Sequence, residues 1–107
     1  MYQVKFTSAF KKSYKRIKKR GLEMALLDEV IEKLRLGQTL EEKYRDHELK
    51  GNFVGFRECH IKPDWLLIYL IEDDILTLTL ADTGSHADLF KMWRQFFVSC
   101  LFCFLLL

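Results

Sequence analysis

Proline and glycine are scarce in this sequence, with one and five residues among 107. These low counts exclude collagen-like and low-complexity architectures. A chain of this length has room for a single domain. The three cysteines are an odd number in a chain with 50% hydrophobic residues, so they do not indicate a disulfide framework. We therefore expect one folded domain in a reducing compartment, the cytoplasm.

Acidic residues are absent from the start of the chain, where Glu23 is the first carboxylate. The first 20 residues hold eight lysines and arginines, although the net charge of the whole chain is only +2. Such a basic run is commonly a solvated helix face, but it also suits a polyanion such as RNA. Lys11 and Lys12, in the densest part of the run, are its candidate substrate contacts.

Several motifs of known chemistry are also missing. The sequence has no Gly-x-x-x-x-Gly-Lys loop and no Gly-x-Ser-x-Gly elbow, so nucleotide hydrolysis and hydrolase-type acyl transfer have no support. Residues 96–107 are apolar except for Ser99, but a helix of that length reaches only roughly 18 Å, against a hydrocarbon core of roughly 30 Å. We expect no membrane span.

Periodicity along the chain predicts an α+β fold. Residues 2–7 alternate as in a strand, with Ser8 as the expected N-cap of a helix that Gly21 ends. Residues 22–36 repeat apolar side chains at helical spacing, which predicts the second helix of a hairpin. Strand-like runs and a short C-terminal helix follow, at residues 56–61, 65–72, 75–82 and 84–90. Because short turns join antiparallel strands, we expect the helices on one face of a small antiparallel sheet, with the other face open.

All three histidines, His47, His60 and His86, lie beside polar or charged neighbours. Histidine titrates near neutral pH, so two of these side chains can act as general base and general acid. Cleavage of RNA needs these two roles and a cation or donor for the charged phosphorane, and Asp64 and Arg57 are candidates to complete the set. On residue types alone, ordinary surface histidines at turns are the alternative.

A zinc site is the competing use for histidines and an acid, and the spacing argues against it. The sequence has no His-x-x-x-His pattern and no Cys-x-x-Cys pair beside a histidine. Cys100 and Cys103 match Cys-x-x-Cys, but they lie in a wholly apolar run without the strand–helix setting of a redox motif. We therefore expect no metal and no cofactor.

Three separated blocks carry a more specific signal: residues 46–51 (DHELKG), 55–69 (GFRECHIKPDWLLIY) and 83–90 (TGSHADLF). In this order they resemble the YafQ branch of the RelE/ParE toxin superfamily, and the likeness runs from Tyr2 to about Phe90. The resemblance implies a toxin of a type II toxin–antitoxin system that cuts messenger RNA in the ribosomal A site without a metal. It also implies a helical hairpin packed on a small antiparallel sheet. The implied partner is an antitoxin, expected to be a ribbon-helix-helix DNA-binding protein.

The resemblance also implies roles for particular residues. The catalytic polar positions of the family are matched by His47, His60, Asp64 and His86. Phe90 matches the C-terminal aromatic that positions the RNA, while Arg57 and Trp65 match flanking positions expected to contact the substrate. In the implied division of roles, His60 or Asp64 is the base, His86 is the acid and His47 holds the phosphate.

Two departures from the family pattern affect these expectations. Members often carry an arginine two residues before the glycine of the Gly-Ser-His block, where this sequence has Asp82. Either Arg57 or the N-terminal lysines supply the missing cation, or activity is low. The family usually ends soon after the position of Phe90, which divides the chain into a toxin domain of residues 1–92 and an apolar extension of residues 93–107.

Two other functions stay open at this point. A toxin of the ParE branch binds DNA gyrase and cuts no RNA, but that branch lacks the histidine and aspartate set present here. An inactive toxin that still binds its antitoxin is the second alternative, and the sequence alone does not separate it from an active enzyme.

Overall fold

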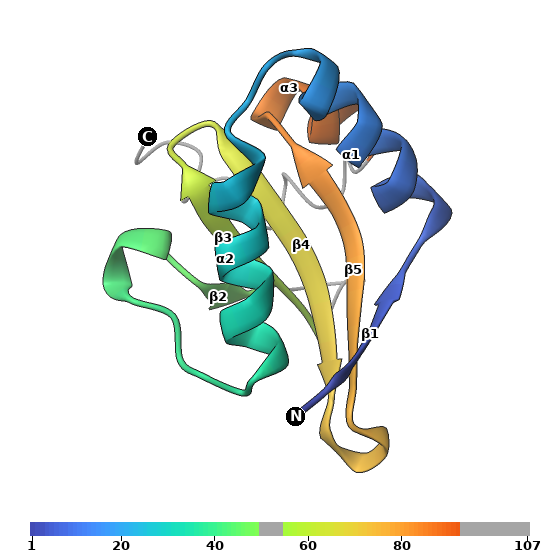
Figure 1. Ribbon diagram of the computed structural model, residues 1–107, viewed down its shortest axis with the longest axis vertical. Coiled ribbons are helices and arrows are strands. Elements are labelled where there is room, and N and C mark those ends of the chain that lie inside the picture. The colour runs from blue at the N-terminus through green and yellow to red at the C-terminus, as the bar shows by residue number, and fades with distance from the viewer. Residues whose placement is uncertain (50–54, 93–107) are drawn as a thin grey trace.

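The computed structural model describes residues 1–49 and 55–92, and the predicted extension of residues 93–107 lies outside them. The elements along the chain are β1 (Gln3–Phe6), α1 (Ser8–Lys19), α2 (Met24–Arg35), η1 (Glu42–Tyr44), β2 (His47–Glu48), β3 (Phe56–Lys62), β4 (Trp65–Glu72), η3 (Asp73–Ile75), β5 (Thr77–Gly84) and α3 (His86–Met92). Figure 1 shows α1 and α2 in front of a twisted sheet. This arrangement confirms the predicted α+β class. None of the helices in the described ranges has the length and apolar character needed to span a membrane.

Helix α1 is capped by Thr7 and not, as predicted, by Ser8. The side chain of Thr7 accepts a hydrogen bond from the backbone N–H of Phe10 at 3.0 Å, and Ser8 is already the first helical residue. Phe10 and Ile17 then face the core. Gly21, at a φ of +82°, turns the chain into α2, a conformation that glycine adopts without the strain of a β-carbon.

The strands form one five-stranded sheet in the order β1-β5-β4-β3-β2. Neighbours are antiparallel except for β1, which lies parallel to β5 with Val4 opposite Leu78. The predicted antiparallel pairing of the three strands that short turns join, β3, β4 and β5, is confirmed, and β1 makes the sheet mixed because it adds a parallel strand at the edge. Most of the chain separates β1 from β5, so no turn length determines its direction. The two-residue strand β2 is an addition to the predicted elements.

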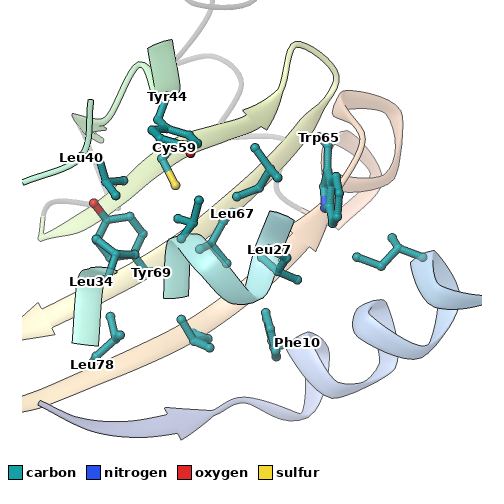
Figure 2. Close-up of a cluster of buried hydrophobic side chains, with 14 residues drawn as sticks. Phe10, Leu27, Leu34, Leu40, Tyr44, Cys59, Trp65, Leu67, Tyr69 and Leu78 are labelled. Carbon is teal, nitrogen blue, oxygen red and sulfur yellow. The ribbon is translucent and has the colours of Figure 1, made fainter. Parts of the chain in front are cut away.

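The main hydrophobic core fills the space between the helix pair and the sheet. Phe10, Leu27 and Leu34 come from the helices, and Leu67 and Leu78 come from the strands that face them (Figure 2). Full burial of one such side chain stabilises the fold by about 1.5–3 kcal/mol, so this cluster is a principal source of stability.

A smaller cluster covers part of the opposite face of the sheet. Leu66 and Ile68 of β4 point away from the helix pair, because side chains alternate along a strand, and they pack with Ala81 of β5 and Leu89 of α3. The expectation that this face is wholly open is therefore wrong. Helix α3 covers one part of it, and the rest is available to the polar residues of β3.

Candidate active site

Strand β3 carries polar side chains on the face of the sheet away from α1 and α2. Its residues Cys59 and Ile61 belong to the main core. Glu58 and His60 alternate with them and therefore point to the opposite face. Both are almost fully buried, with 1% and 3% of their surface exposed. Polar groups buried so deeply take hydrogen-bond partners, and those partners define the site.

His60 and His47 both approach the carboxylate of Glu58. His60 Nε2 donates to Glu58 Oε1 at 3.0 Å, and His47 Nε2 lies 3.7 Å from the same oxygen. Strand β2 brings His47 there, because it pairs with β3 so that His47 lies opposite Glu58. His47 Nδ1 donates to the backbone carbonyl of Arg45 at 2.8 Å, which fixes the orientation of the ring.

Glu58 is a candidate site residue that the sequence analysis missed. A signal for it was present, because Glu58 and His60 are two residues apart in a predicted strand. That spacing places both side chains on one face of the sheet. An acid at this spacing from a candidate histidine is therefore a candidate partner for it.

Asp64, in the turn between β3 and β4, holds His86 at the start of α3. Its Oδ1 accepts from the backbone N–H of His86 at 2.9 Å and from the ring Nδ1 at 2.6 Å. A carboxylate in this place selects the tautomer with the proton on Nδ1, which leaves Nε2 as the ring atom able to accept a proton. This geometry does not support Asp64 as the general base, because its carboxylate is bound to His86.

The three histidine rings lie next to one another across the site. The ring centroids of His47 and His60 are 6.4 Å apart, and those of His60 and His86 are 5.9 Å apart, both with edge-to-face rings. The structure therefore brings together the three histidines and, through His86, Asp64. Three imidazole rings thus surround one spot, beside the buried carboxylate of Glu58.

An ion pair anchors the start of α3 to the end of α1. Arg20 donates from Nη1 to Asp88 Oδ2 at 2.6 Å and from Nη2 to Oδ1 at 3.0 Å. Asp88 also accepts from the backbone N–H of Ser85 at 3.0 Å. The bonds from Arg20, followed by those from Ser85, hold the pKa of Asp88 well below its usual range. Gly84 precedes Ser85 in the chain, and a β-carbon at Gly84 would lie only 3.1 Å from the Asp88 side chain. Because glycine has no β-carbon, the backbone can turn close to Asp88, and this turn sets the position of His86.

Arg57 lies on the other face of the sheet from the histidines. Its Nη2 donates to Asp46 Oδ2 at 3.1 Å, and its Nη1 lies 3.5 Å from Glu48 Oε1. Tyr69 donates its hydroxyl to Asp46 as well, and burial together with this bond raises the pKa of Tyr69. The expectation that Arg57 supplies a cation to the phosphorane is not supported, because two carboxylates hold it on the helix side.

Three of the other predicted substrate contacts, Trp65, Lys11 and Lys12, lie in the main core or on α1 and not among the histidines. Trp65 is 3% exposed and belongs to the main core, where its indole N–H donates to Thr83 Oγ1 at 3.0 Å (Figure 2). This burial makes Trp65 a support for the fold beneath the site. Lys11 and Lys12 lie on α1, which packs on the helix side of the sheet. Phe90 belongs to α3, but its side chain lies outside the described part of the structure.

Asp82, which stands where the family often has arginine, is buried beside α1. Its Oδ1 accepts from the hydroxyl of Ser13 at 2.5 Å and from the backbone N–H of Thr83 at 2.8 Å. Arg16 donates to the same Ser13 hydroxyl at 3.1 Å. The carboxylate of Asp82 therefore joins α1 to β5, which gives the reversed charge a structural role.

The described residues offer no site for a metal ion. Among residues 1–49 and 55–92, no three His, Cys, Asp or Glu side chains come together in an arrangement that could hold a metal ion. The thiol of Cys59 is buried on the helix side, and burial raises its pKa. A neutral thiol of this kind is a core side chain and not a ligand.

Comparison with known proteins places the chain in a family. Residues 2–91 match the family described as "Bacterial toxin of type II toxin-antitoxin system, YafQ". The mRNA interferase toxin YafQ of Escherichia coli strain K12 is 35% identical over 89 residues, which cover 81% of this chain and 94% of that protein. The match therefore includes nearly the full length of this relative.

Solved structures show the same likeness in three dimensions. A metal-bound toxin from Helicobacter pylori is 43% identical, with a TM-score of 0.79 over 84% of this chain and 100% of that one. Escherichia coli YafQ in its complex with DinJ is 33% identical, with a TM-score of 0.77 over 84% of this chain and 99% of that one. Sequence and fold agree over residues that include the whole histidine site, and the chain belongs to the YafQ family of bacterial toxins of type II toxin–antitoxin systems.

Proposed function

We propose that this toxin is an endoribonuclease that cuts messenger RNA on the ribosome by general acid–base catalysis without a metal ion. The observation that carries the proposal is the convergence of His47, His60 and His86, with Asp64 bound to His86. Its relative in Escherichia coli is named an mRNA interferase toxin. Imidazoles paired with carboxylates supply both proton-transfer roles that cleavage of an RNA strand requires.

The reaction assigned to this site is attack by a 2′-hydroxyl on the adjacent phosphorus. A base removes the 2′-hydroxyl proton as the bond from O2′ to phosphorus forms. The bond from phosphorus to the 5′-oxygen then breaks, and an acid gives that oxygen a proton. The products are a 2′,3′-cyclic phosphate and a 5′-hydroxyl end, so atoms and charge balance without a further reactant.

His86 suits the role of acid, because Asp64 holds its Nδ1 and leaves Nε2 to give a proton to the 5′-oxygen. His47 suits the role of base, since its side chain is 33% exposed and the bond from Nδ1 to the Arg45 carbonyl makes Nε2 the proton acceptor. This assignment reverses the roles implied for His47 and His60. His60 is almost fully buried against Glu58, where it is better placed to stabilise the charged phosphorane between the other two rings.

Cleavage by the purified toxin on ribosomes programmed with a defined message tests the proposal. We expect cuts to persist at an EDTA concentration that leaves the ribosomes intact, and each new 3′ end to carry a cyclic or 3′-phosphate. The chelator control matters because a relative from Helicobacter pylori was crystallised with a metal bound. A 3′-hydroxyl product, or activity restored to chelated enzyme by zinc, would falsify the mechanism.

The proposed partners follow from the same function. YafQ of Escherichia coli forms a complex with DinJ, and we propose that this chain likewise binds a cognate antitoxin of the ribbon-helix-helix class in the cytoplasm. On the ribosome, the substrate is messenger RNA in the A site. Lys11 and Lys12 lie on the helix side of the sheet, where contact with ribosomal RNA phosphates is their proposed role.

The same assay separates the proposed nuclease from both alternative functions. A gyrase-binding toxin of the ParE type cuts no message, and a toxin that only binds its antitoxin cuts none either. The histidine and aspartate site favours the nuclease over both, since neither alternative requires these side chains to lie together. An intact message after incubation with correctly folded toxin would support one of the alternatives.

A further inference from the structure

A pocket of about 370 Å³ lies beside His60, between η1 and the turn that joins β3 to β4. Tyr44 and Ile61 form part of its wall. Its cationic lining consists of Lys43, Arg45 and Lys62, and no acid is among the described residues that line it. The volume falls in the range of roughly 300–1,000 Å³ that is typical of small-ligand sites. We call this site the basic pocket.

Two walls of the basic pocket are connected to the catalytic histidines. On one side, the backbone carbonyl of Arg45 binds His47 Nδ1 at 2.8 Å. On the other side, Lys62 is two residues before Asp64, which binds His86 Nδ1 at 2.6 Å. His60 itself lines the pocket, so a ligand held between the side chains of Arg45 and Lys62 lies next to this histidine.

The charged groups of the basic pocket are displayed toward solvent. Arg45 and Lys62 are exposed, and Lys43 lies 3.9 Å from the nearest oxygen of Glu41. Arg45 is held at φ +48° and ψ +45°, a left-handed conformation that is uncommon for a residue with a β-carbon and that concentrates at functional sites. A concave surface lined by charges of one sign attracts ligands of the opposite sign.

A second groove on the described surface has different chemistry. It lies on the helix side and is lined mainly by apolar side chains, with Phe6, Phe10, Tyr14 and Ile31 among them. None of the three histidines lines this groove, whereas His60 lines the basic pocket. The groove combines Lys11 and Lys15 with the acid Asp28, while the basic pocket has three cations and no acid among its described lining residues, which suits the negative phosphate of an RNA nucleotide better.

We propose that the basic pocket is a subsite for the RNA nucleotide next to the scissile phosphate, with that nucleotide's phosphate bound by Arg45 and Lys62. The assignment rests on the proposed function, because it requires RNA at the histidines. Arginine binds phosphate oxygens through two parallel N–H groups, and lysine acts as a mobile point charge. The subsite thereby supplies cationic charge that neither Arg57 nor the Asp82 position provides.

The double variant Arg45→Gln/Lys62→Gln tests this subsite on ribosomes programmed with a defined message. We expect KM to rise by about tenfold or more while kcat stays close to wild type, because phosphate contacts are lost and the histidines are retained. The slope of log affinity against log salt concentration should become shallower by about 0.7, the contribution of one neutralised phosphate on a single strand. Lys62→Arg, which keeps the charge, should retain the wild-type KM.

Lys5→Gln is the matched control, because it removes an exposed positive charge from β1, at the other edge of the sheet. It should leave KM and the salt slope unchanged. Equal KM for wild type and the double variant, or an equal rise in KM for Lys5→Gln, would overturn the subsite while the proposed function stands. A wild-type protein that cuts no message would overturn the proposed function itself. A double variant with a lower Tm and wild-type KM would show that the pocket residues are structural, which also overturns the subsite.

Discussion

The two faces of the same sheet bury different chemistry. The helix-side face buries a large apolar cluster, and its polar groups are paired locally, as where Arg57 and Tyr69 both bond to Asp46. The opposite face buries a smaller apolar cluster and, beside it, His60, His86 and Glu58, with the partly exposed His47 next to them. Burying a carboxylate costs free energy unless partners offset it, so the second arrangement favours chemistry over stability.

Strand β3 shows how close together these two demands lie. Cys59 belongs to the main core, while its neighbours Glu58 and His60 belong to the histidine site. Side chains along a strand alternate between faces, so a slip of one residue in register would exchange the two sets. The pairing of β3 with β4, with Cys59 opposite Leu67, therefore positions the core and the site together. A substitution on one face that leaves this register unchanged is therefore expected to leave the role of the other face intact.

The largest expected effect is on the histidine face. His86→Ala should lower the cleavage rate on programmed ribosomes by roughly 10²–10⁴, because it removes the proposed general acid. The free energy of unfolding should fall by about 1–3 kcal/mol, since the hydrogen bond to Asp64 and the ring contact with His60 are lost at a buried position, and this loss is too small to unfold the protein. Single-turnover cleavage and thermal unfolding measured on the same preparation check both parts. A variant that cuts at the wild-type rate would remove His86 from the mechanism.

The opposite result is expected on the helix-side face. Leu67 is fully buried in the main core, so Leu67→Ala should lower the free energy of unfolding by about 2–5 kcal/mol. At a temperature where the variant remains folded, kcat should match the wild type. Urea unfolding and single-turnover cleavage measure the two quantities. A large loss of kcat in fully folded Leu67→Ala protein would show that the faces are coupled through the strands.

The sequence allowed the helices, the three long strands and the three histidines to be predicted, because each depends on local periodicity or residue type. The direction of β1 was not predictable in this way, since its pairing with β5 joins the two ends of the described chain. The N-cap was misplaced by one residue because Thr7 and Ser8 are both good caps. Local signals therefore determine elements, while long-range pairing determines the sheet.

Partners within the site were harder to predict than its members. Residue types placed Asp64 and Arg57 among the candidates, but only the fold shows that Asp64 binds His86 and that Arg57 faces away. Trp65 matches a motif position and yet lies in the core, because it is the first residue of β4 and its side chain points to the helix side of the sheet. At Asp82, the charge is opposite to that of the arginine often found at this motif position. The fold explains it, because Asp82 accepts a hydrogen bond from Ser13, a residue distant in sequence.

The smallest expected effect is at the contact between α1 and α3, where the two faces meet. Arg20→Gln should lower the free energy of unfolding at pH 7 by less than about 1 kcal/mol, because the Arg20 side chain is 46% exposed and solvent screens the pair. Arg20 holds the pKa of Asp88 below the unfolded value of about 3.9. The stabilisation is therefore fully present above that value and is lost as the pH falls through the lower pKa of the folded state.

Urea unfolding of wild type and Arg20→Gln between pH 7 and pH 2 measures this dependence. The gap between the two proteins should be constant above about pH 5 and should narrow as the pH falls below about 4, where Asp88 in the unfolded chain begins to gain a proton while Asp88 in the folded protein stays ionised. Lys19→Gln, one residue earlier on the same helix, removes an equal charge without breaking this pair and should show no such narrowing. A gap that stays constant down to pH 2 would mean that Arg20 stabilises α3 through packing of its side chain and not through the charge of Asp88.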